Sequence, residues 1–259
     1  MKYNTIYFAD VIDFLNKLPN DSIDLAVVDP PYNMKKGQWD TFKTEDDYFA
    51  FMAKWLDLLI PKLKQKASLY LFNNAYNSAI LLNMLKDRDI VFRNWITWYK
   101  KDGFSATKRK YVNNQETILF YTKSDDYTFN CDDIRVPYTS TSRMLCASKK
   151  GIIKNGKRWY PNEKGKLCGD VWEIISQRHK TKENGRVQKA LHPTIKPTEM
   201  IERIIKASSN EGDMVLDLFS GSGTTAKTAI TLNRAFIGCE NNELYIKHIK
   251  EQNIEISNV

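Results

Sequence analysis

The chain has few residues of the kinds that bind metals or form disulfides. Its 259 residues include only four cysteines and three histidines. No two cysteines form a Cys-x-x-Cys pair, and the histidines do not complete a metal-ligand spacing with them. We therefore expect no metal site, and we expect thiols that stay reduced and are mostly structural.

Long hydrophobic runs are also missing. No stretch approaches the roughly 20 apolar residues that a membrane-spanning helix needs. Residues 1–10 lack the basic start and the apolar run of a secretory signal. With 42% hydrophobic residues, the chain still has enough apolar side chains for a folded core. We expect a single globular domain over residues 1–259, located in the cytoplasm and not attached to a membrane.

The positive charge is concentrated in one part of the chain. The net charge is +8, but residues 143–189 hold 13 Lys and Arg against four Asp and Glu, a net +9 that leaves −1 for the rest. Trp159, Tyr160 and Trp172 lie in the same segment. A basic surface with aromatic side chains is typical of contact with a polyanion. A solvated basic loop without a partner is an equally open interpretation.

Short apolar runs alternate with segments of helical periodicity along the chain. This alternation favours an α/β fold with a mostly parallel sheet and helices on both faces. The expected strands cover residues 24–28, 68–72, 95–98, 117–121, 214–219 and 235–239, and the expected helices cover 11–18, 45–64, 75–86, 197–208, 224–232 and 242–254. The region 130–191 is polar and too long for an ordinary connection, so we expect a functional insertion there.

A glycine-rich turn follows the expected strand at 214–219. The sequence Ser-Gly-Ser-Gly-Thr-Thr-Ala at 220–226 leads into an expected helix, and Glu240 ends the next strand. Glycines let the backbone approach a ligand, and a carboxylate after the next strand can accept hydrogen bonds from ribose hydroxyls. The pattern predicts a nucleotide-like cofactor, with a dinucleotide or an empty tight turn as the alternatives.

The position of this turn in the chain constrains the topology. Only 19 residues follow Glu240, enough for one helix, so the remaining strands of the cofactor-binding half must come from the N-terminal part. We therefore expect a Rossmann-like, circularly permuted sheet of about seven strands, with Ile6-Tyr7-Phe8 as the strand next to the cofactor. Asp10, which follows, can accept a hydrogen bond from an amino group of the cofactor, or cap the next helix.

A second motif follows the strand at 24–28. Asp29-Pro30-Pro31-Tyr32 stands at the C-terminal end of a strand, where α/β proteins place their sites. The two prolines fix the backbone and leave neighbouring carbonyls free to accept hydrogen bonds. An exocyclic amine on a nucleobase is a poor nucleophile because its lone pair is delocalised into the ring. Asp29 and the Pro30 carbonyl can accept its two N–H groups, and Tyr32 offers a face on which the base can stack.

The order of these motifs resembles the β class of DNA amino-methyltransferases, which methylate N6 of adenine or N4 of cytosine. Asp-Pro-Pro-Tyr comes first, followed by the basic insertion, by His-Pro-Thr-Ile-Lys-Pro at 192–197 and by the glycine-rich turn. Segments at 94–98, 115–120, 154–159 and 176–180 are similar to those of adenine-specific members. None of the four cysteines follows a proline, which argues against the cysteine nucleophile of C5-cytosine enzymes.

The resemblance implies S-adenosylmethionine as cofactor and a role for each matching residue. Glu240 would hold the ribose of the cofactor, and Asp10 would reach its adenine. Thr194 and Lys196 would lie at its methionine end, where Lys196 could pair with the carboxylate. Ile195 departs from the polar residue that many members carry. The catalytic turn and the rest of the cofactor site would consist of Asp29, Pro30, Pro31 and Tyr32, and of Phe219, Gly221, Ser222, Gly223, Thr224 and Thr225.

We therefore expect a site-specific enzyme that methylates N6 of a flipped-out adenine in double-stranded DNA, as part of a restriction-modification system with a cognate endonuclease. Asp29 favours adenine, but N4-cytosine enzymes use the same chemistry, and an amine on RNA is a further alternative. A DNA-binding protein that had lost its activity would be expected to have lost Asp29 or the glycine-rich turn. The insertion at 130–191 would be the target-recognition region. Enzymes of this class are often dimers, so we expect a homodimer.

Overall fold

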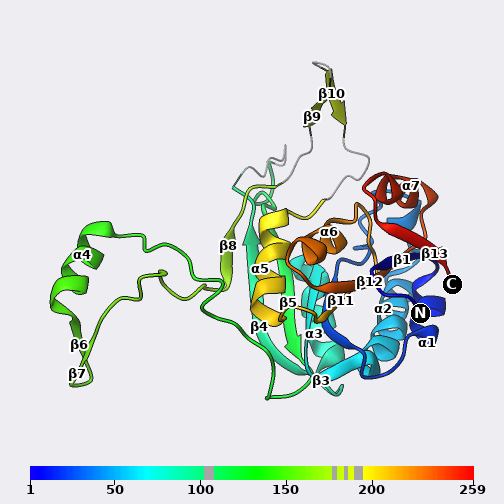
Figure 1. Cartoon of the computed structure of the whole chain (residues 1–259). Coiled ribbons are helices and arrows are strands. Elements are labelled where there is room, and N and C mark those ends of the chain that lie inside the picture. Colours follow the sequence, from blue (N-terminus) through cyan, green and yellow to red (C-terminus); the bar gives the residue numbers. More distant parts are fainter. Residues whose placement is uncertain (102–107, 177–179, 184–185, 190–194) are drawn as a thin grey trace.

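Nine strands form one sheet at the centre of the molecule (Figure 1). The computed structural model describes residues 1–101, 108–176, 180–183, 186–189 and 195–259. Every described pairing in this sheet is parallel except those of β5, which runs against its neighbours. In spatial order the strands are β13 (Glu255–Asn258), β1 (Thr5–Phe8), β12 (Ala235–Glu240), β11 (Met214–Asp217), β2 (Ile23–Val28), β3 (Leu63–Asn73), β5 (Gln115–Thr122), β4 (Val91–Tyr99) and β8 (Val171–Glu173).

The N-terminal strand lies against the C-terminal part of the chain, as the permuted topology requires. β1 pairs in parallel with β12, and Phe8 stands opposite Glu240. The expected number of about seven strands is wrong, because β13 and β8 extend the sheet at its two edges. Both strands are short and carry little apolar periodicity, so neither had a strand signal in the sequence.

Two hydrophobic cores lie on the two faces of the sheet. The helices α1 (Val11–Lys17), α2 (Glu45–Leu59) and α3 (Ala75–Leu85) pack on one face, and α5 (Thr198–Ser208), α6 (Thr224–Thr231) and α7 (Glu243–Glu251) pack on the other. β2 separates the cores by alternation: Ala26 and Val28 join the first, and Leu25 and Val27 join the second. Each such fully buried Leu or Val contributes about 1.5–3 kcal/mol. The predicted helices on both faces are confirmed.

The helix expected over residues 45–64 is shorter than predicted. It begins with a capping box, in which the Thr44 side chain accepts from the Asp47 backbone N–H at 3.0 Å and the Asp47 side chain accepts from that of Thr44 at 3.2 Å. It ends at Leu59, a 3-10 turn follows, and β3 already begins at Leu63. Pro61 in that turn lacks the N–H that a continuing helix needs. The other expected elements are present, with ends shifted by up to five residues.

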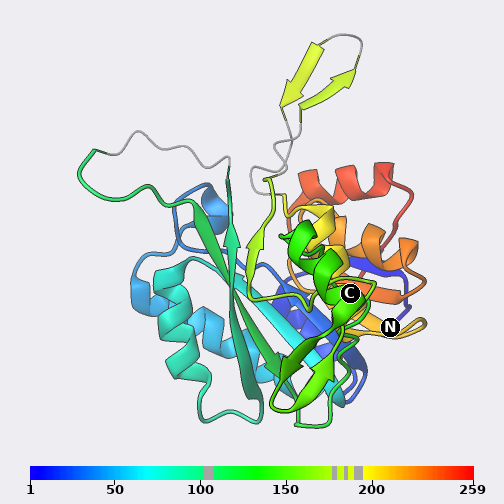
Figure 2. The ribbon, with the colours of Figure 1, turned by 90° about the vertical axis from the view of Figure 1, so that its left-hand side faces the viewer.

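The expected insertion at 130–191 contains a projecting part, which we call the arm (residues 137–165). Figure 1 shows it extending away from the sheet with the helix α4 (Thr141–Lys150) and the hairpin of β6 (Ile152–Lys154) and β7 (Lys157–Trp159), and Figure 2 shows it from its outer end, in front of the sheet. Its base is closed by two backbone hydrogen bonds of 2.9 Å between Val136 and Lys166. The chain then returns to the sheet as β8, and a second hairpin pairs β9 (Lys180–Glu183) with β10 (Arg186–Lys189).

The three aromatic residues of the basic segment do not share one surface. Trp159 and Tyr160 are 48% and 53% exposed, as a contact surface requires, but Trp172 is only 5% exposed. β8 places the Trp172 ring in the core, where its Nε1 donates to the Gly169 carbonyl at 2.8 Å and the Arg203 guanidinium lies 5.1 Å from the ring centre. The expectation that Trp172 belongs to an exposed polyanion surface is therefore wrong.

Candidate active site

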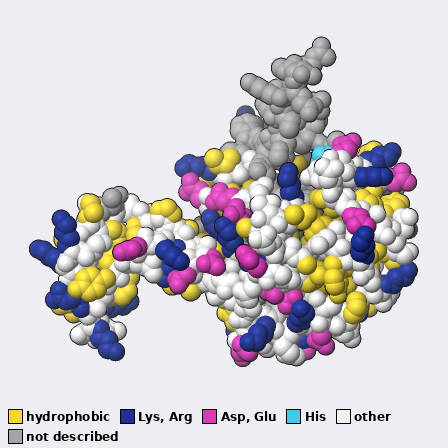
Figure 3. All heavy atoms as spheres, in the orientation of Figure 1, with side chains coloured by type: hydrophobic (Ala, Val, Ile, Leu, Met, Phe, Trp, Pro, Cys, Tyr) yellow, Lys and Arg dark blue, Asp and Glu magenta, His cyan; other side chains and the backbone are white. Residues whose placement is uncertain are grey.

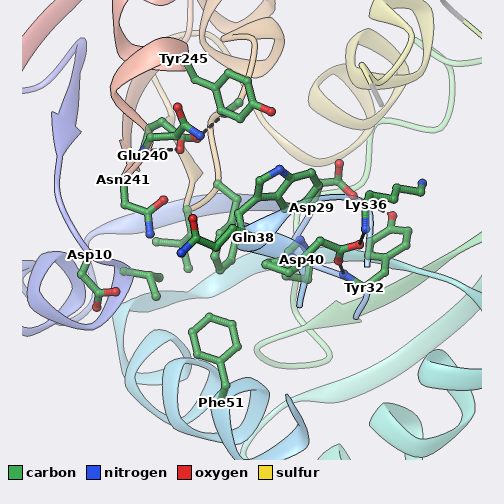
Figure 4. A pocket seen from close by; sticks show the side chains of 18 of the residues that line it. Asp10, Asp29, Tyr32, Lys36, Gln38, Asp40, Phe51, Glu240, Asn241 and Tyr245 are labelled. Carbon is green, nitrogen blue, oxygen red and sulfur yellow. Dashed lines mark hydrogen bonds between the residues drawn. The ribbon is translucent and has the colours of Figure 1, made fainter. Parts of the chain in front are cut away.

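The C-terminal ends of β1, β2, β11 and β12 meet around a cavity of about 290 Å³ (Figure 4). Parallel strands that end at one edge bring together residues far apart in the sequence. The cavity is lined by eight of the predicted site residues: Asp10, Asp29, Pro30, Pro31, Tyr32, Phe219, Gly221 and Glu240.

A smaller cavity of about 30 Å³ adjoins the first and shares Asp29, Phe219 and Gly221 with it. Four more predicted residues line it: Lys196, Ser222, Thr224 and Thr225. Gly223 lines neither cavity; it adopts a φ of 76°, and a Cβ there would lie 3.3 Å from the Ile249 side chain. Gly223 therefore allows the glycine-rich turn to pack closely against α7. Thr194 lies outside the described residues.

Glu240 is held in place by the backbone around it. Its Oε2 accepts from the Gly221 N–H and its Oε1 accepts from the Asn242 N–H, both at 2.8 Å. A carboxylate has about four lone-pair sites, so Glu240 keeps acceptor capacity at the cavity that it lines. Burial raises the pKa of Glu240, partly offset by these hydrogen bonds.

Asp217, at the end of β11, is a second buried carboxyl group beside the cavities. Burial raises its pKa to about 7, against the hydrogen bonds from Thr225 and from the Phe219 N–H, and the negative charges of Asp29 and Glu240 add to the rise. Carboxyl groups that are hard to ionise favour a positively charged ligand, because a cation lowers the energy of their charged form. Asp217 lies in the strand predicted before the glycine-rich turn, but no role was predicted for it.

Asp10 caps α1, since its side chain accepts from the Ile12 N–H at 2.8 Å. The same residue is exposed at the wall of the larger cavity, apart from Glu240 and Tyr245 in Figure 4. Capping uses one oxygen, so a contact with a bound ligand is compatible with it. That contact remains a prediction.

The catalytic turn is built around an ion pair. Asp29 Oδ2 lies 2.6 Å from Lys196 Nζ, and Asp29 Oδ1 accepts from the Tyr32 hydroxyl at 2.7 Å. The Lys196 ammonium also stands 5.4 Å from the centre of the Tyr32 ring. Lys196 therefore contacts the aspartate of the motif in this structure, and its pairing with a cofactor carboxylate stays a prediction.

The loop after Tyr32 was not predicted as part of the site. Its conformation depends on the side chain of Asp40, which is only 1% exposed. The Asp40 carboxylate accepts from three backbone N–H groups, those of Tyr32 at 2.6 Å, Met34 at 3.0 Å and Lys36 at 3.2 Å. The Asn77 side chain donates to the Tyr32 carbonyl at 2.8 Å. These bonds tie the loop between Tyr32 and Asp40 to the catalytic turn.

Other cavity residues were missed as well. Asn241 and Asn242 directly follow Glu240, so the strand-end rule that found Glu240 could have found them. Phe51 lies on α2, and its ring contacts Phe219 at 6.3 Å edge to face; only the tertiary packing brings it there. The lining residues of the larger cavity without a sequence prediction are Ala9, Val11, Lys36, Gln38, Trp39, Asp40, Thr41, Phe42, Phe51, Leu218, Asn241, Asn242 and Tyr245.

A family profile described as DNA methylase matches residues 23–251 of the chain. The chain belongs to this family. It is a DNA methyltransferase, and the family uses S-adenosylmethionine. The resemblance inferred from the motif order is confirmed.

Two curated relatives match the methyltransferase over most of its length. The type II methyltransferase M1.MboII of Moraxella bovis is 50% identical over 246 residues, which cover 95% of this chain and 95% of that protein. The DNA adenine methyltransferase YhdJ of Escherichia coli (strain K12) is 35% identical over 248 residues, with 94% and 80% covered. The segments at 94–98, 115–120, 154–159 and 176–180 are the ones that indicated adenine-specific members of the family.

Solved structures share the fold. The crystal structure of the M1.HpyAVI–SAM complex has a TM-score of 0.64 at 23% identity and covers 96% of this chain and 98% of that one. The PvuII DNA methyltransferase, described as cytosine-N4-specific, has a TM-score of 0.68 at 16% identity, with 94% and 83% covered. Within the described residues, no helix is both long and apolar enough to cross a membrane, and no cluster of His, Cys, Asp and Glu is placed to hold a metal ion.

Proposed function

We propose that this methyltransferase transfers the methyl group of S-adenosylmethionine to N6 of a flipped-out adenine in double-stranded DNA. The observation that carries the proposal is the arrangement of one cavity: Asp29 and Tyr32 stand at one side of it and Glu240 at the other (Figure 4). Asp29 in the motif and the adenine methyltransferase among the relatives support adenine as the base.

The charges of the cavity suit this cofactor. S-adenosylmethionine supplies an activated methyl group on a sulfonium, and it also carries an ammonium. Asp217 and Glu240, whose pKa values are raised by burial, gain from a positively charged neighbour. The free acceptor sites of Glu240 suit ribose hydroxyls, and the exposed carboxylate of Asp10 suits an amino group of the adenine ring. Phe219 offers an apolar wall of the same cavity.

The chain contributes positioning and hydrogen-bond acceptors. Two of the lone-pair sites of Asp29 are used by Lys196 and Tyr32, so others remain for an N–H of the target amine. The Pro30 carbonyl accepts the second N–H. Together they draw the amine lone pair out of the ring and aim it at the methyl group. The amine gives up one proton on methylation, and Asp29 is the acceptor within reach. Correct placement of two reactants supplies about 7–11 kcal/mol of such a barrier.

We propose that the arm contacts the DNA and acts in target recognition. Figure 3 shows Lys and Arg side chains spread over the arm, around exposed hydrophobic ones. Trp159 and Tyr160 are half exposed among them. The described basic residues of the arm include Lys149, Lys150, Lys154, Lys157, Arg158 and Lys164. Phosphate contacts from such residues supply affinity, and aromatic and polar side chains can reach base edges.

The wider setting is proposed from the relatives. The type II designation of M1.MboII supports a restriction-modification system with a cognate endonuclease. A homodimer is proposed from the class of enzyme that the motif order indicates. We further propose that residues 1–259 form one domain with the recognition region inserted at 130–191, of which β8 completes the sheet.

The test is transfer of labelled methyl groups from S-adenosylmethionine to unmethylated duplex DNA. The wild-type chain transfers label, and Asp29→Ala abolishes transfer while cofactor binding persists. Asp46→Ala, an exposed aspartate in the first turn of α2, is the matched control and keeps the wild-type rate. A wild-type chain that binds the cofactor but leaves DNA unlabelled would overturn the proposal.

A further inference from the structure

A buried glutamate lies behind the catalytic turn, and no prediction from the sequence gave it a role. Glu116 is the second residue of β5 and is 8% exposed. Its Oε2 lies 3.4 Å from Lys196 Nζ and accepts from the Tyr32 hydroxyl at 3.4 Å. Its Oε1 accepts from Lys100 Nζ, just beyond the end of β4. Glu116 therefore reaches the two partners of Asp29 from the opposite side.

The four charged groups form an alternating chain. Lys100 contacts Glu116, Glu116 shares Lys196 with Asp29, and Asp29 faces the cavity. Taking an ammonium out of water costs several kcal/mol unless carboxylates compensate it, and Lys196 is only 7% exposed. If Asp29 were the only carboxylate near Lys196, the ammonium would bind it tightly and occupy its acceptor sites. With Glu116 present, the ammonium interacts with both carboxylates.

We propose that Glu116 is a positioning residue of the transfer reaction: it shares the Lys196 ammonium with Asp29, keeps that ammonium charged beside the catalytic carboxylate, and leaves Asp29 open to the target amine. The inference rests on the proposed function of Asp29. Glu116 touches neither cavity, so it acts through Lys196 and through the Tyr32 hydroxyl.

The ionisation of the group agrees with this geometry. Burial alone would raise the pKa of Glu116, but Lys196 and Lys100 lower it to about 2. Glu116 is therefore negatively charged at neutral pH. Burial alone would lower the pKa of Lys196, but Asp29 and Glu116 raise it.

Other ionisable groups surround the pair. From the loop after the catalytic turn, the positive charge of Lys36 also lowers the pKa of Glu116. From the end of β11, Asp217 lines the small cavity together with Lys196. Burial, together with Asp29 and Glu116, keeps the pKa of Tyr32 well above its usual value, so the phenol stays neutral and can donate.

The decisive variant is Glu116→Gln. The amide keeps the shape and removes the charge, so Lys196 is left with one carboxylate and its pKa falls. We expect the single-turnover rate to fall by about 10- to 100-fold, the effect of a misplaced catalytic group, with a smaller change in KM. We also expect the alkaline limb of the rate profile to move to lower pH. A purely structural role would lower the rate equally at every pH.

Two further variants test whether the effect depends on the charge of Glu116 and on its position. Glu116→Asp retains the charge and should restore the alkaline limb with part of the rate. If Glu116→Gln does not fold, Glu116→Asp is compared with the wild type alone. We then expect a reduced methylation rate and an alkaline limb of the pH–rate profile at the same pH as in the wild type. A wild-type rate would overturn the inference. Glu255→Gln, on the edge strand β13, removes an exposed ion pair with Lys2 outside the recognition region, and should leave rate and pH profile unchanged.

A readout without activity separates this inference from the proposed function. The pKa of the Lys196 ammonium, followed by side-chain NMR, should fall in Glu116→Gln relative to the wild type. An unchanged pKa, an unchanged rate, or a pH-independent loss that Glu116→Asp does not relieve would overturn the role of Glu116. Failure of the wild type to methylate DNA would instead remove the proposed function, and the NMR titration would still decide whether Glu116 holds Lys196.

Discussion

A single carboxylate holds the catalytic turn in shape. The prolines at 30 and 31 fix the direction of the chain, but residues 33–37 after the turn lie in no helix or strand that could satisfy their N–H groups. Asp40 accepts three of them from a position that is 1% exposed. Buried N–H groups that lose their acceptor destabilise a fold by about 1–3 kcal/mol each. The shape of the turn therefore depends on a residue eight positions beyond Tyr32.

Asp40→Asn tests this dependence. The amide offers one acceptor oxygen in place of two, so at least one N–H loses its partner. We expect the free energy of unfolding to fall by about 1–3 kcal/mol and the single-turnover methylation rate to fall by about tenfold or more. Urea unfolding and rapid quench measure the two effects. Asp87→Asn, at an exposed position after α3, is the control; equal behaviour of the two variants would refute the role of Asp40.

Asp217 makes stability depend on pH. Its pKa is about 7 in the folded chain and about 3.9 in an unfolded one. A group whose pKa is raised by folding contributes stability that is complete below the unfolded pKa and is lost as pH rises through the folded pKa. Without cofactor, the wild type should therefore lose stability relative to Asp217→Asn between about pH 4 and pH 7. Urea titrations at several pH values measure this difference, and parallel curves would contradict it.

At the scale of elements, the backbone of β12 lies close to the end of β11 at Gly238, beside the glycine-rich turn. Gly238 permits this approach: a Cβ there would lie 2.6 Å from the Asp217 carbonyl oxygen and 2.8 Å from Ser220 Oγ. The carbonyl belongs to the sheet backbone, so it cannot move aside without shifting β11. The spacing of the strands under the glycine-rich turn is thus set by a residue outside the turn.

Gly238→Ala should therefore destabilise the chain by about 1–3 kcal/mol, as overpacking of a core does, and should weaken cofactor binding. Gly169→Ala is the matched control, because a Cβ at Gly169 has no neighbour within 4 Å, and it should be close to neutral. Thermal unfolding and a cofactor titration compare the two variants. Equal melting temperatures would show that the strands are free to separate.

The elements differ in how far the sequence predicts them. The strand, glycine-rich turn and helix over residues 214–231 were predicted, because apolar periodicity and turn residues are local signals. The end of α2 was misplaced because periodicity continued through Pro61. The fold of residues 33–42 could not be predicted, since the partners of Asp40 are backbone N–H groups that every residue carries. Glu116 lies in the segment 115–120 that carries part of the family resemblance, but only the tertiary structure brings it to Lys196.

At the scale of the whole molecule, the basic residues of the arm are separated from the cavity proposed to bind the cofactor. The arm projects from the far edge of the sheet, joined through a base closed by Val136 and Lys166 (Figure 1). The composition predicted a basic segment, but not that part of it is buried and part exposed. β8 returns to the sheet and buries Trp172, while the hairpin of β6 and β7 stays exposed. Affinity for DNA and methyl transfer should therefore be separable by mutation.

Lys154→Gln combined with Lys157→Gln tests this separation, since both lysines are exposed in the arm hairpin. We expect weaker DNA binding and a salt dependence whose slope is smaller by up to about 2, because each phosphate contact contributes about 0.9. The rate at saturating DNA should not change. Lys17→Gln with Lys54→Gln, two exposed lysines on α1 and α2, is the control; an equal loss in both pairs would show that the arm has no special part in DNA binding.

The most direct measurement identifies the nucleoside that the enzyme produces. Unmethylated duplex DNA is incubated with the wild-type chain and S-adenosylmethionine, digested to nucleosides and examined by mass spectrometry, with Asp29→Ala in parallel. We predict N6-methyladenine from the wild type and none from the variant. N4-methylcytosine would keep the chemistry of the catalytic turn and contradict adenine as the target. Methylated DNA from the Asp29→Ala variant at the wild-type level would contradict the role of Asp29 itself.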